Sequence, residues 1–303
     1  MRAGYVSGIY TLTSVISGIT TWHWIDRFNQ KKFLLSNMFL LGGLTLMILT
    51  TDSYPVLLTL RFSAGLIGGT TMGVGTALVI KLSPEQLRTR MLATIITSFS
   101  VVSIAGMPCV LFLYEYYNWR VALVLAALLC FAALPLILKD IPEPEFNGLP
   151  GKTLHVSPEM LLFASGNALA LFSPMLIVPI LVPLLLKTMH APEWLFVVGS
   201  VAEFVATKMT GRLSTSFTGF GLGFASTLLF GISLLFPLCN ISAYWAFIVM
   251  FLGASYSSLV ASSAVSIRFT DENNRAGFLT LQAALMSLST TAAFFISSLL
   301  LSD

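Results

Sequence analysis

The sequence predicts an all-α integral membrane protein, a bundle of about ten transmembrane helices in two pseudo-symmetric halves. Three observations predict this fold class. Hydrophobic residues make up 56% of the 303 residues, and charged residues only 10%. Soluble domains carry about 25% charged residues, so this chain has too few charges to coat a surface in water. The mean hydropathy is +0.88, and apolar runs of membrane-spanning length recur along the chain.

Ten apolar runs are each long enough to cross a bilayer, because a spanning helix needs about 20 mostly apolar residues. They cover roughly residues 4–24, 33–51, 54–81, 89–113, 119–138, 159–186, 193–213, 219–238, 243–267 and 276–301. The segment 139–158 is rich in Pro and charge, so we expect it to be a cytoplasmic linker. It divides the chain into an N-terminal helical bundle, 1–138, and a C-terminal helical bundle, 159–303, with five spans each.

The basic residues set the predicted orientation. Twelve of the 16 Lys and Arg residues lie in alternate loops, at 25–32, 81–90, 139–158, 208–218 and 268–275. The positive-inside rule places these loops in the cytoplasm. We therefore expect a multi-pass protein of a bacterial-type cell inner membrane, in contact with the lipid bilayer. The net charge of +3 is small and scattered, which argues against nucleic-acid binding.

The sequence offers no sign of an enzyme, a cofactor or a metal site. Cys109, Cys130 and Cys239 are far apart and form no C-x-x-C pair, which disfavours a disulfide framework or a zinc site. The chain has no H-E-x-x-H or G-x-S-x-G motif, and no close acid pair within a span. An intramembrane enzyme is thus the disfavoured alternative.

The strongest local signal is the loop WIDRFNQKK at 24–32, between the first two runs. It resembles the loop signature of the major facilitator superfamily, G-x-L-a-D-R-x-G-R-[RK]. An acid and two bases stand in matching positions, namely Asp26, Arg27 and Lys31. Trp22 replaces the first Gly, which normally permits close helix contact. Asn29 replaces the second, and Asn tolerates the left-handed backbone of a tight turn.

Further motifs of the superfamily follow along the chain. The segment 61–65, which begins with Arg61, resembles R-x-x-q-G, with Ala64 in place of Gln. Its last residue opens a ladder of small residues that is expected to let helix backbones approach closely, at Gly65, Gly69 and Gly73. Gly106 and Pro108 lie in the next span, where antiporters of the superfamily carry a Gly-Pro-rich motif, and we expect both residues to serve helix packing.

The two halves share short patterns. Residues 83–88 and 270–275 both read [ST]-[PD]-E-x-x-R, which predicts a hydroxyl N-cap followed by an acid in a first helical turn. Residues 210–215 resemble a decayed copy of the loop signature, with Thr215 in the position of the Asp. Three prolines are expected to break the run 159–186 into segments: Pro174, Pro179 and Pro183.

The resemblance is closest to the drug and sugar efflux branch, whose members exchange solute for protons. It implies a secondary active transporter of a small molecule, with proton-coupled efflux by alternating access and a monomer favoured. The superfamily has twelve spans in two bundles of six, and by motif alignment the first and last spans are missing here. The alternative is therefore a truncated or non-transporting protein of this fold, either a remnant or a scaffold.

Two ionisable residues lie inside predicted spans, where a charge is costly and is a functional candidate by default. Glu203 lies near the midplane, and our hypothesis is that it carries the proton. The alternatives are a carboxyl that stays neutral or one that pairs with Lys208. Arg61 is a candidate for holding a substrate anion or a carboxylate, or for reaching out to the interface or to backbone carbonyls.

Other polar residues receive weaker expectations. Three of them, Asn167, Tyr256 and Gln282, are candidates for substrate contact, although hydrogen bonding between helices also explains them. In the superfamily, the loop acid sits against a helix start in the other half and stabilises one arrangement of the transporter. The resemblance therefore places Asp26 at the helix that begins near Ala276. Arg88 and Arg275 are expected to join Asp26 in a charge relay.

Overall fold

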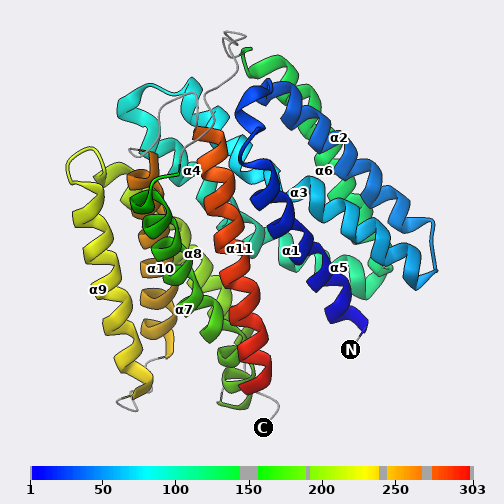
Figure 1. Ribbon diagram of the computed structural model, residues 1–303. Coiled ribbons are helices and arrows are strands. Elements are labelled where there is room, and N and C mark those ends of the chain that lie inside the picture. Colours follow the sequence, from blue (N-terminus) through cyan, green and yellow to red (C-terminus); the bar gives the residue numbers. More distant parts are fainter. Residues whose placement is uncertain (1, 144–155, 189–191, 239–243, 268–274, 301–303) are drawn as a thin grey trace. The chain divides into compact units, whose positions relative to one another are not determined.

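The computed structural model describes residues 2–143, 156–188, 192–238, 244–267 and 275–300, and these residues are almost entirely helical (Figure 1). The helices are α1 (Arg2–Thr21), α2 (Gln30–Leu49), α3 (Tyr54–Leu82), α4 (Arg88–Val101), α5 (Met107–Tyr116), α6 (Trp119–Asp140), α7 (Pro158–Thr188), α8 (Pro192–Leu213), α9 (Gly219–Leu238), α10 (Tyr244–Ser266) and α11 (Arg275–Leu300). Two short 3₁₀ helices, η1 (Ile25–Arg27) and η2 (Glu85–Leu87), lie in loops. A π-helix, η3 (Val102–Gly106), joins α4 to α5.

Within the described residues, eight helical segments are long and apolar enough to cross a membrane. They are Gln30–Leu49, Tyr54–Leu82, Glu85–Gly106, Trp119–Asp140, Pro158–Val178, Gly219–Phe236, Tyr244–Ser266 and Arg275–Ser297. Large apolar side chains on their surfaces are exposed, such as Leu162 (75%) and Phe224 (74%). A helix whose outer face is apolar requires lipid around it, so the predicted all-α membrane fold class is confirmed.

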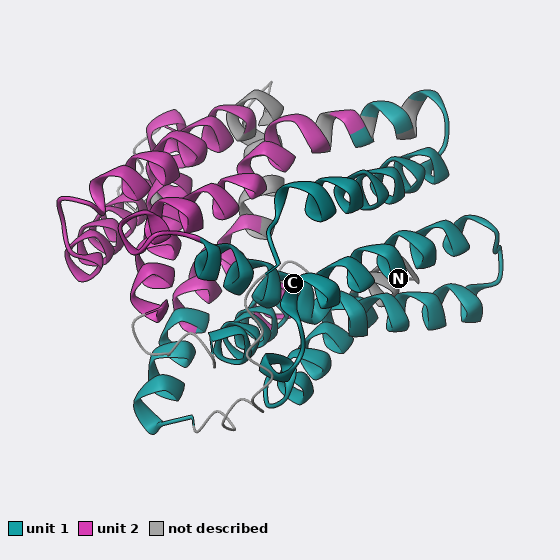
Figure 2. Ribbon diagram, turned by 90° about the horizontal axis from the view of Figure 1, so that it is seen from above, with its two compact units in different colours: residues 1–82, 110–168, 270–291 teal, residues 83–109, 169–269, 292–303 magenta. Residues whose placement is uncertain are grey.

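The chain divides into two compact units, each assembled from segments that are distant in sequence (Figure 2). Unit 1 comprises residues 1–82, 110–168 and 270–291. Unit 2 comprises 83–109, 169–269 and 292–303. The predicted sequence halves, 1–138 and 159–303, are a different division and stay a prediction. Most of their linker, residues 144–155, lies outside the described residues.

In unit 1, glycines let the backbones of α1, α3 and α11 approach closely. A Cβ atom at Gly65 would collide with Thr13, and one at Gly69 would lie 2.7 Å from the Cα of Ser14, both on α1. At Gly73 the added atom would lie 2.7 Å from the Cα of Thr280 on α11. The ladder in α3 therefore packs against two different helices, as small residues do at membrane helix interfaces.

Hydroxyls and one amide join the helices of unit 1 where glycines bring them close. The Ser14 hydroxyl donates a hydrogen bond to the Gly65 carbonyl at 3.2 Å. Between α2 and α3, the Asn37 amide donates to the Thr70 and Thr71 hydroxyls, both at 3.1 Å. Such bonds between membrane helices contribute about 0.6 kcal/mol each on average, so they add specificity to the close packing.

In unit 2, helix α8 packs against both α4 and α10, and α10 also packs against α9. An aromatic core fills the space around α10, where Phe251 is fully buried and contacts Phe230 and Phe247 with ring centroids 5.3 and 5.4 Å apart. On the α4 side, Gly211 allows α8 to approach so closely that a Cβ there would lie 2.5 Å from the Cβ of Ala93. This packing fixes the α4–α8 interface that carries the buried acid.

Helix α7 runs without a break from Pro158 to Thr188, so the predicted interruption at its three inner prolines, Pro174, Pro179 and Pro183, is wrong. Each proline removes one backbone donor, but neighbouring helices and side chains can compensate in a membrane helix. The irregular backbone occurs instead at η3, which ends at Gly106, two residues before Pro108. Single π-helical turns of this kind are known causes of irregularity within α-helices.

Gly106 ends η3, and a Cβ there would meet, among the described side chains, only Val102 of its own turn at 3.3 Å. The helix-packing role expected for Gly106 and Pro108 stays a prediction. Gly106 lies at the junction of the π-helix η3 and α5. Pro108 is the second residue of α5, a position in the first turn where proline is tolerated.

The predicted cap at Ser83 does not start α4. Residues 85–87 form the separate 3₁₀ helix η2, and α4 begins at Arg88 after Leu87, which makes no side-chain cap hydrogen bond. Ser83 is followed by Pro84, which favours an extended turn over a continuous helix at that point. The corresponding residues 270–274 lie outside the described ranges.

Asn29 caps α2 and does not adopt the left-handed backbone expected for it. Its φ and ψ are −65° and 109°, and its side chain accepts hydrogen bonds from the backbone N–H groups of Lys31 and Lys32 at 3.0 and 3.1 Å. Asn is among the preferred N-cap residues because its side-chain oxygen satisfies free donors of the first turn. Asn29, which replaces the second glycine of the signature, thus stabilises the N-terminus of α2.

We expect Asn29→Ala to destabilise the protein by about 1 kcal/mol, the usual cost of losing such a cap. Asn29→Asp should leave stability nearly unchanged, because the carboxylate caps as well and favours the helix N-terminus. Thermal unfolding of the purified protein in detergent measures both. A destabilisation by Asn29→Asp as large as that by Asn29→Ala would contradict the capping role.

Candidate functional site

The centre of unit 2 holds a buried carboxyl group. Glu203 lies on α8 and is only 2% exposed. Its Oε1 atom accepts a hydrogen bond from the hydroxyl of Ser100 on α4, at 2.5 Å. Lys208, the alternative partner, donates to the Thr94 hydroxyl at 3.1 Å. The recorded partner of the acid is therefore a neutral hydroxyl, which leaves the carboxyl free to hold or release a proton.

Two more polar side chains of unit 2 belong to the helices that hold this carboxyl or pack against it. Tyr256 on α10 interacts electrostatically with Glu203, and it packs against Ala93, Ile96 and Val260 in the α4–α10 contact. Thr207 lies one turn along α8 from Glu203 and is fully buried. The sequence predicted Glu203 and Tyr256 separately, and the structure brings them together. Ser100 and Thr207 were missed, because a hydroxyl in an apolar run is common and gives no signal by itself.

In unit 1, the carboxylate of Asp26 caps the first turn of α11. Its Oδ1 accepts a hydrogen bond from the backbone N–H of Ala276 at 3.0 Å, and its Oδ2 accepts one from Gly277 at 2.8 Å. These are unpaired donors of a helix N-terminus, where the helix dipole also favours an anion. The contact expected from the superfamily signature is present. Its gating role stays a prediction.

Gly277 explains how Trp22 can replace the glycine of the signature. A Cβ at residue 277 would collide with the Trp22 carbonyl oxygen and would lie 2.6 Å from Oδ2 of Asp26. The close approach that the signature's glycine normally permits is here provided by a glycine on the opposite helix. Gly18 adds to this, since its Cβ would lie 2.6 Å from that of Ala284 on α11.

Asp26 lies in η1, outside the spanning segments. Burial raises the pKa of Asp26 from 3.8 to about 6, although the backbone N–H groups of Gly277 and Ala276 and the Lys81 ammonium act to lower it. The loss of hydration therefore outweighs the two hydrogen bonds. Its proton is exchanged close to physiological pH, so this contact is sensitive to cytoplasmic acidity in the predicted orientation.

We expect the stability contributed by Asp26 to fall as pH rises. With a pKa of about 6 folded and 3.8 unfolded, the folded state binds the extra proton between these values. The contribution is complete below about pH 4 and is lost as pH rises through about 6. Asp26→Asn cannot titrate, so the stability of wild type relative to this variant should drop by at most about 3 kcal/mol between pH 4 and 7. Thermal unfolding in detergent measures the difference, and a constant or rising difference would contradict the sign.

The remaining predicted residues lie in several places. In unit 1, Lys31 is 7% exposed, and its ammonium donates to the carbonyls of Leu138 and Ile141 at 3.2 and 2.6 Å, at the end of α6. Arg27 is exposed in η1, and Arg275 is buried at the start of α11. Lys31 therefore stabilises a helix C-terminus, where a cation is favoured.

Three candidates for substrate contact belong to unit 1, and their role stays a prediction. Arg61 on α3 is partly buried and acts electrostatically on Tyr10 of α1. Asn167 on α7 and Gln282 on α11 are buried. The Oε1 atom of Gln282 has no hydrogen-bond partner among the described residues. No group of three or more His, Cys, Asp or Glu side chains that could hold a metal ion occurs in the part of the chain that the structure describes.

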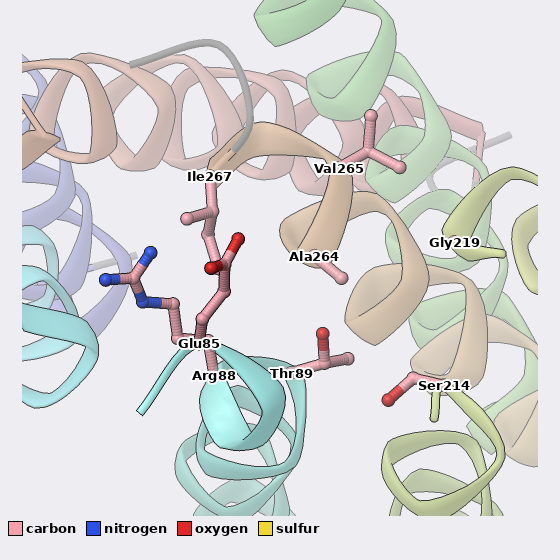
Figure 3. Close-up of a pocket in the computed structure, with 8 residues that line it drawn as sticks. All are labelled: Glu85, Arg88, Thr89, Ser214, Gly219, Ala264, Val265 and Ile267. Carbon is pink, nitrogen blue, oxygen red and sulfur yellow. The ribbon is translucent and has the colours of Figure 1, made fainter. Parts of the chain in front are cut away.

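A pocket of about 180 Å³ lies in unit 2 at the start of α4 (Figure 3). It is lined by Glu85, Arg88, Thr89, Ser214, Gly219, Ala264, Val265 and Ile267. Thr215, in the Asp position of the decayed signature, lies outside this lining and donates to the Arg212 carbonyl at 2.8 Å. Among the residues that the structure describes, the hydrogen bond recorded for the Thr215 side chain is this local one, and none to a helix start is recorded. Arg88 lines this pocket.

Comparison with known proteins decides the family. A model of the Major Facilitator Superfamily matches residues 2–190, more than half of the chain. The chain belongs to the major facilitator superfamily. The match covers the Asp26 loop and the α3 glycine ladder, so the resemblance seen in these motifs is confirmed.

Curated relatives match part of the chain, and one of them is named as a transporter. The 4-hydroxybenzoate transporter PcaK of Pseudomonas aeruginosa is 30% identical over 122 residues, which are 39% of this chain and 26% of that protein. The chloramphenicol resistance protein of Streptomyces lividans is 26% identical over 176 residues, 54% of this chain and 45% of that protein. The matches thus span less than half the length of these relatives.

The fold of the superfamily is also found in solved structures. The human organic anion transporter MFSD10 (TETRAN) superposes with a TM-score of 0.78 at 14% identity, over 97% of this chain and 76% of that chain. At this identity the likeness establishes the fold alone. It supports the superfamily-type helical bundle predicted from the sequence.

Proposed function

We propose that this chain functions as a secondary active transmembrane transporter that exports a small molecule in exchange for protons, by alternating access. The observation that carries the proposal is the Glu203 carboxyl, 2% exposed and bonded to the neutral Ser100 hydroxyl. A buried carboxyl without a cationic partner can alternate between the protonated and ionised forms at moderate energetic cost.

Three further observations support the proposal. One relative is named as a transporter, and another is named for chloramphenicol resistance, which is consistent with export. The Asp26 cap on α11 is a contact that can form and break, and a contact of this kind contributes about 0.3–1 kcal/mol when exposed and more when partly buried. Conformations that alternate differ by only a few kcal/mol, so contacts of this size bias the equilibrium between them.

The experiment that tests the proposal is flux in reconstituted vesicles. The chain is placed in proteoliposomes, an inward or outward pH gradient is imposed, and the movement of labelled chloramphenicol and 4-hydroxybenzoate is followed. The two compounds are chosen as first probes because they occur in the names of the relatives. Transport that reverses with the gradient supports the proposal. Flux equal to that of protein-free vesicles for a wider panel of small solutes would favour the alternative of a non-transporting remnant or scaffold.

A further inference from the structure

Thr207 is an exception among the buried hydroxyls of the α4–α8 interface. Thr97 on α4 and Thr210 on α8 both donate to the carbonyl four residues earlier, at 2.5 and 2.9 Å. This is the usual arrangement for Thr in a membrane helix. The Thr207 hydroxyl is fully buried and has no hydrogen-bond partner among the described residues. A buried hydroxyl without a partner costs about 1–3 kcal/mol, so a group that binds it is required.

The Glu203 carboxyl lies four residues before Thr207 on α8 and needs donors when it is ionised. Residues four apart lie on the same face of a helix with Cβ atoms about 5–6 Å apart. Side chains of a helix lean toward its N-terminus, so we expect the Thr207 hydroxyl to reach toward Glu203. A carboxylate has two oxygens that both accept hydrogen bonds, and the Ser100 hydroxyl binds one of them.

We propose that Thr207 is a positioning residue that supplies a second hydroxyl to the ionised Glu203 carboxylate, in addition to the Ser100 hydroxyl on α4. This inference rests on the proposed proton-carrying role of Glu203. The bond to Ser100 joins two helices, whereas a bond to Thr207 stays within α8. Deprotonation of Glu203 increases its demand for donors, and the Thr207 hydroxyl meets part of that demand.

The surroundings of Glu203 are compatible with this second bond. The titratable group that faces it from α10 is Tyr256. Lys208, on α8 itself, is bound to Thr94 of α4. The neighbouring η3, Val102–Gly106, contains no titratable side chain. The Ser100 and Thr207 hydroxyls are therefore the proposed donors to the carboxylate.

The test is an infrared titration of the full chain in lipid nanodiscs. The C=O stretch of the protonated carboxyl is followed against pH, and Glu203→Gln identifies the band. Thr207→Val removes the hydroxyl and keeps the shape of the side chain. Because the ionised form then loses a donor, the midpoint should rise by about one pH unit, a tenfold weaker acid. Thr207→Ser should keep the wild-type midpoint, and the matched control Thr210→Val, whose hydroxyl binds the Ala206 carbonyl, should keep it as well.

The outcomes separate the two proposals. A wild-type midpoint in Thr207→Val overturns the role of Thr207 and leaves the proton-carrying role of Glu203 standing. If Thr207→Val does not fold, Thr207→Ala must show the same rise relative to Thr207→Ser. The absence of any titrating band that disappears in Glu203→Gln overturns the proposed function and this inference together. A purely structural role for Thr207 would lower the melting temperature of Thr207→Val without moving the midpoint.

Discussion

Glu203→Gln is expected to abolish transport driven by a pH gradient and to bring it to the level of protein-free vesicles. Gln keeps the shape of Glu and can still accept the hydrogen bond from Ser100, which in the wild type is 2.5 Å long. Gln has no titratable proton, so the pH gradient has no group at this site on which it can act. Exchange of labelled for unlabelled substrate without a gradient should persist, because it requires conformational change but no net proton movement.

A matched control separates the buried site from a general effect of charge. Glu159 is exposed in the first turn of α7, and Glu159→Gln makes the same chemical change there. We expect this variant to retain gradient-driven transport. Retention of gradient-driven transport by Glu203→Gln at the wild-type rate would show that the buried carboxyl is not the coupling group.

Gly73→Ala is expected to disrupt the packing of unit 1. The added Cβ would lie 2.7 Å from the Cα and 2.8 Å from the backbone N of Thr280. Backbone atoms within a helix cannot move aside as a flexible side chain can, so α3 and α11 must separate. Overpacking of this kind typically costs about 1–3 kcal/mol, and the larger Gly73→Leu should yield little folded protein. Thermal unfolding and size-exclusion chromatography in detergent measure these effects.

The control for this substitution is Gly43→Ala in α2. Apart from its chain neighbours and the backbone of its own helical turns, no atom of the described residues lies within 4 Å of the position of its Cβ. Because Ala is favoured over Gly in a helix by about 0.8–1 kcal/mol, this variant should be as stable as the wild type or more stable. Equal melting temperatures for Gly73→Ala and Gly43→Ala would show that the α3–α11 contact is looser than described.

Composition and run length predicted the helices well, because lipid imposes a simple rule of length and hydrophobicity. They could not predict the continuity of α7 through its three prolines, since the compensation for lost backbone bonds comes from other parts of the fold. The π-helix η3 could not be predicted either, because one extra residue in a helical turn does not change the pattern of an apolar run.

The candidate site was predictable only where a residue is costly in its surroundings or belongs to a motif. Glu203 stood out because a charge in a membrane span is expensive, and Asp26 because the superfamily signature supplied its partner. Ser100 and Thr207 are ordinary residues whose importance depends on what they face. Gly277 permits the close helix approach that the signature's glycine, replaced here by Trp22, normally permits. Such a compensation on the opposite helix cannot be predicted without knowing that the two segments are in contact. The substrate-contact candidates of unit 1 remain predictions for the same reason.

The most direct measurement is substrate-dependent proton movement by the reconstituted chain. Proteoliposomes containing a trapped pH indicator, with no initial pH gradient, receive a transported solute on one side. The wild type should move protons in the direction opposite to the solute, and Glu203→Gln should move solute by exchange without any change in internal pH. An equal pH change in both proteins, or solute movement without a pH change in the wild type, would contradict proton exchange through Glu203.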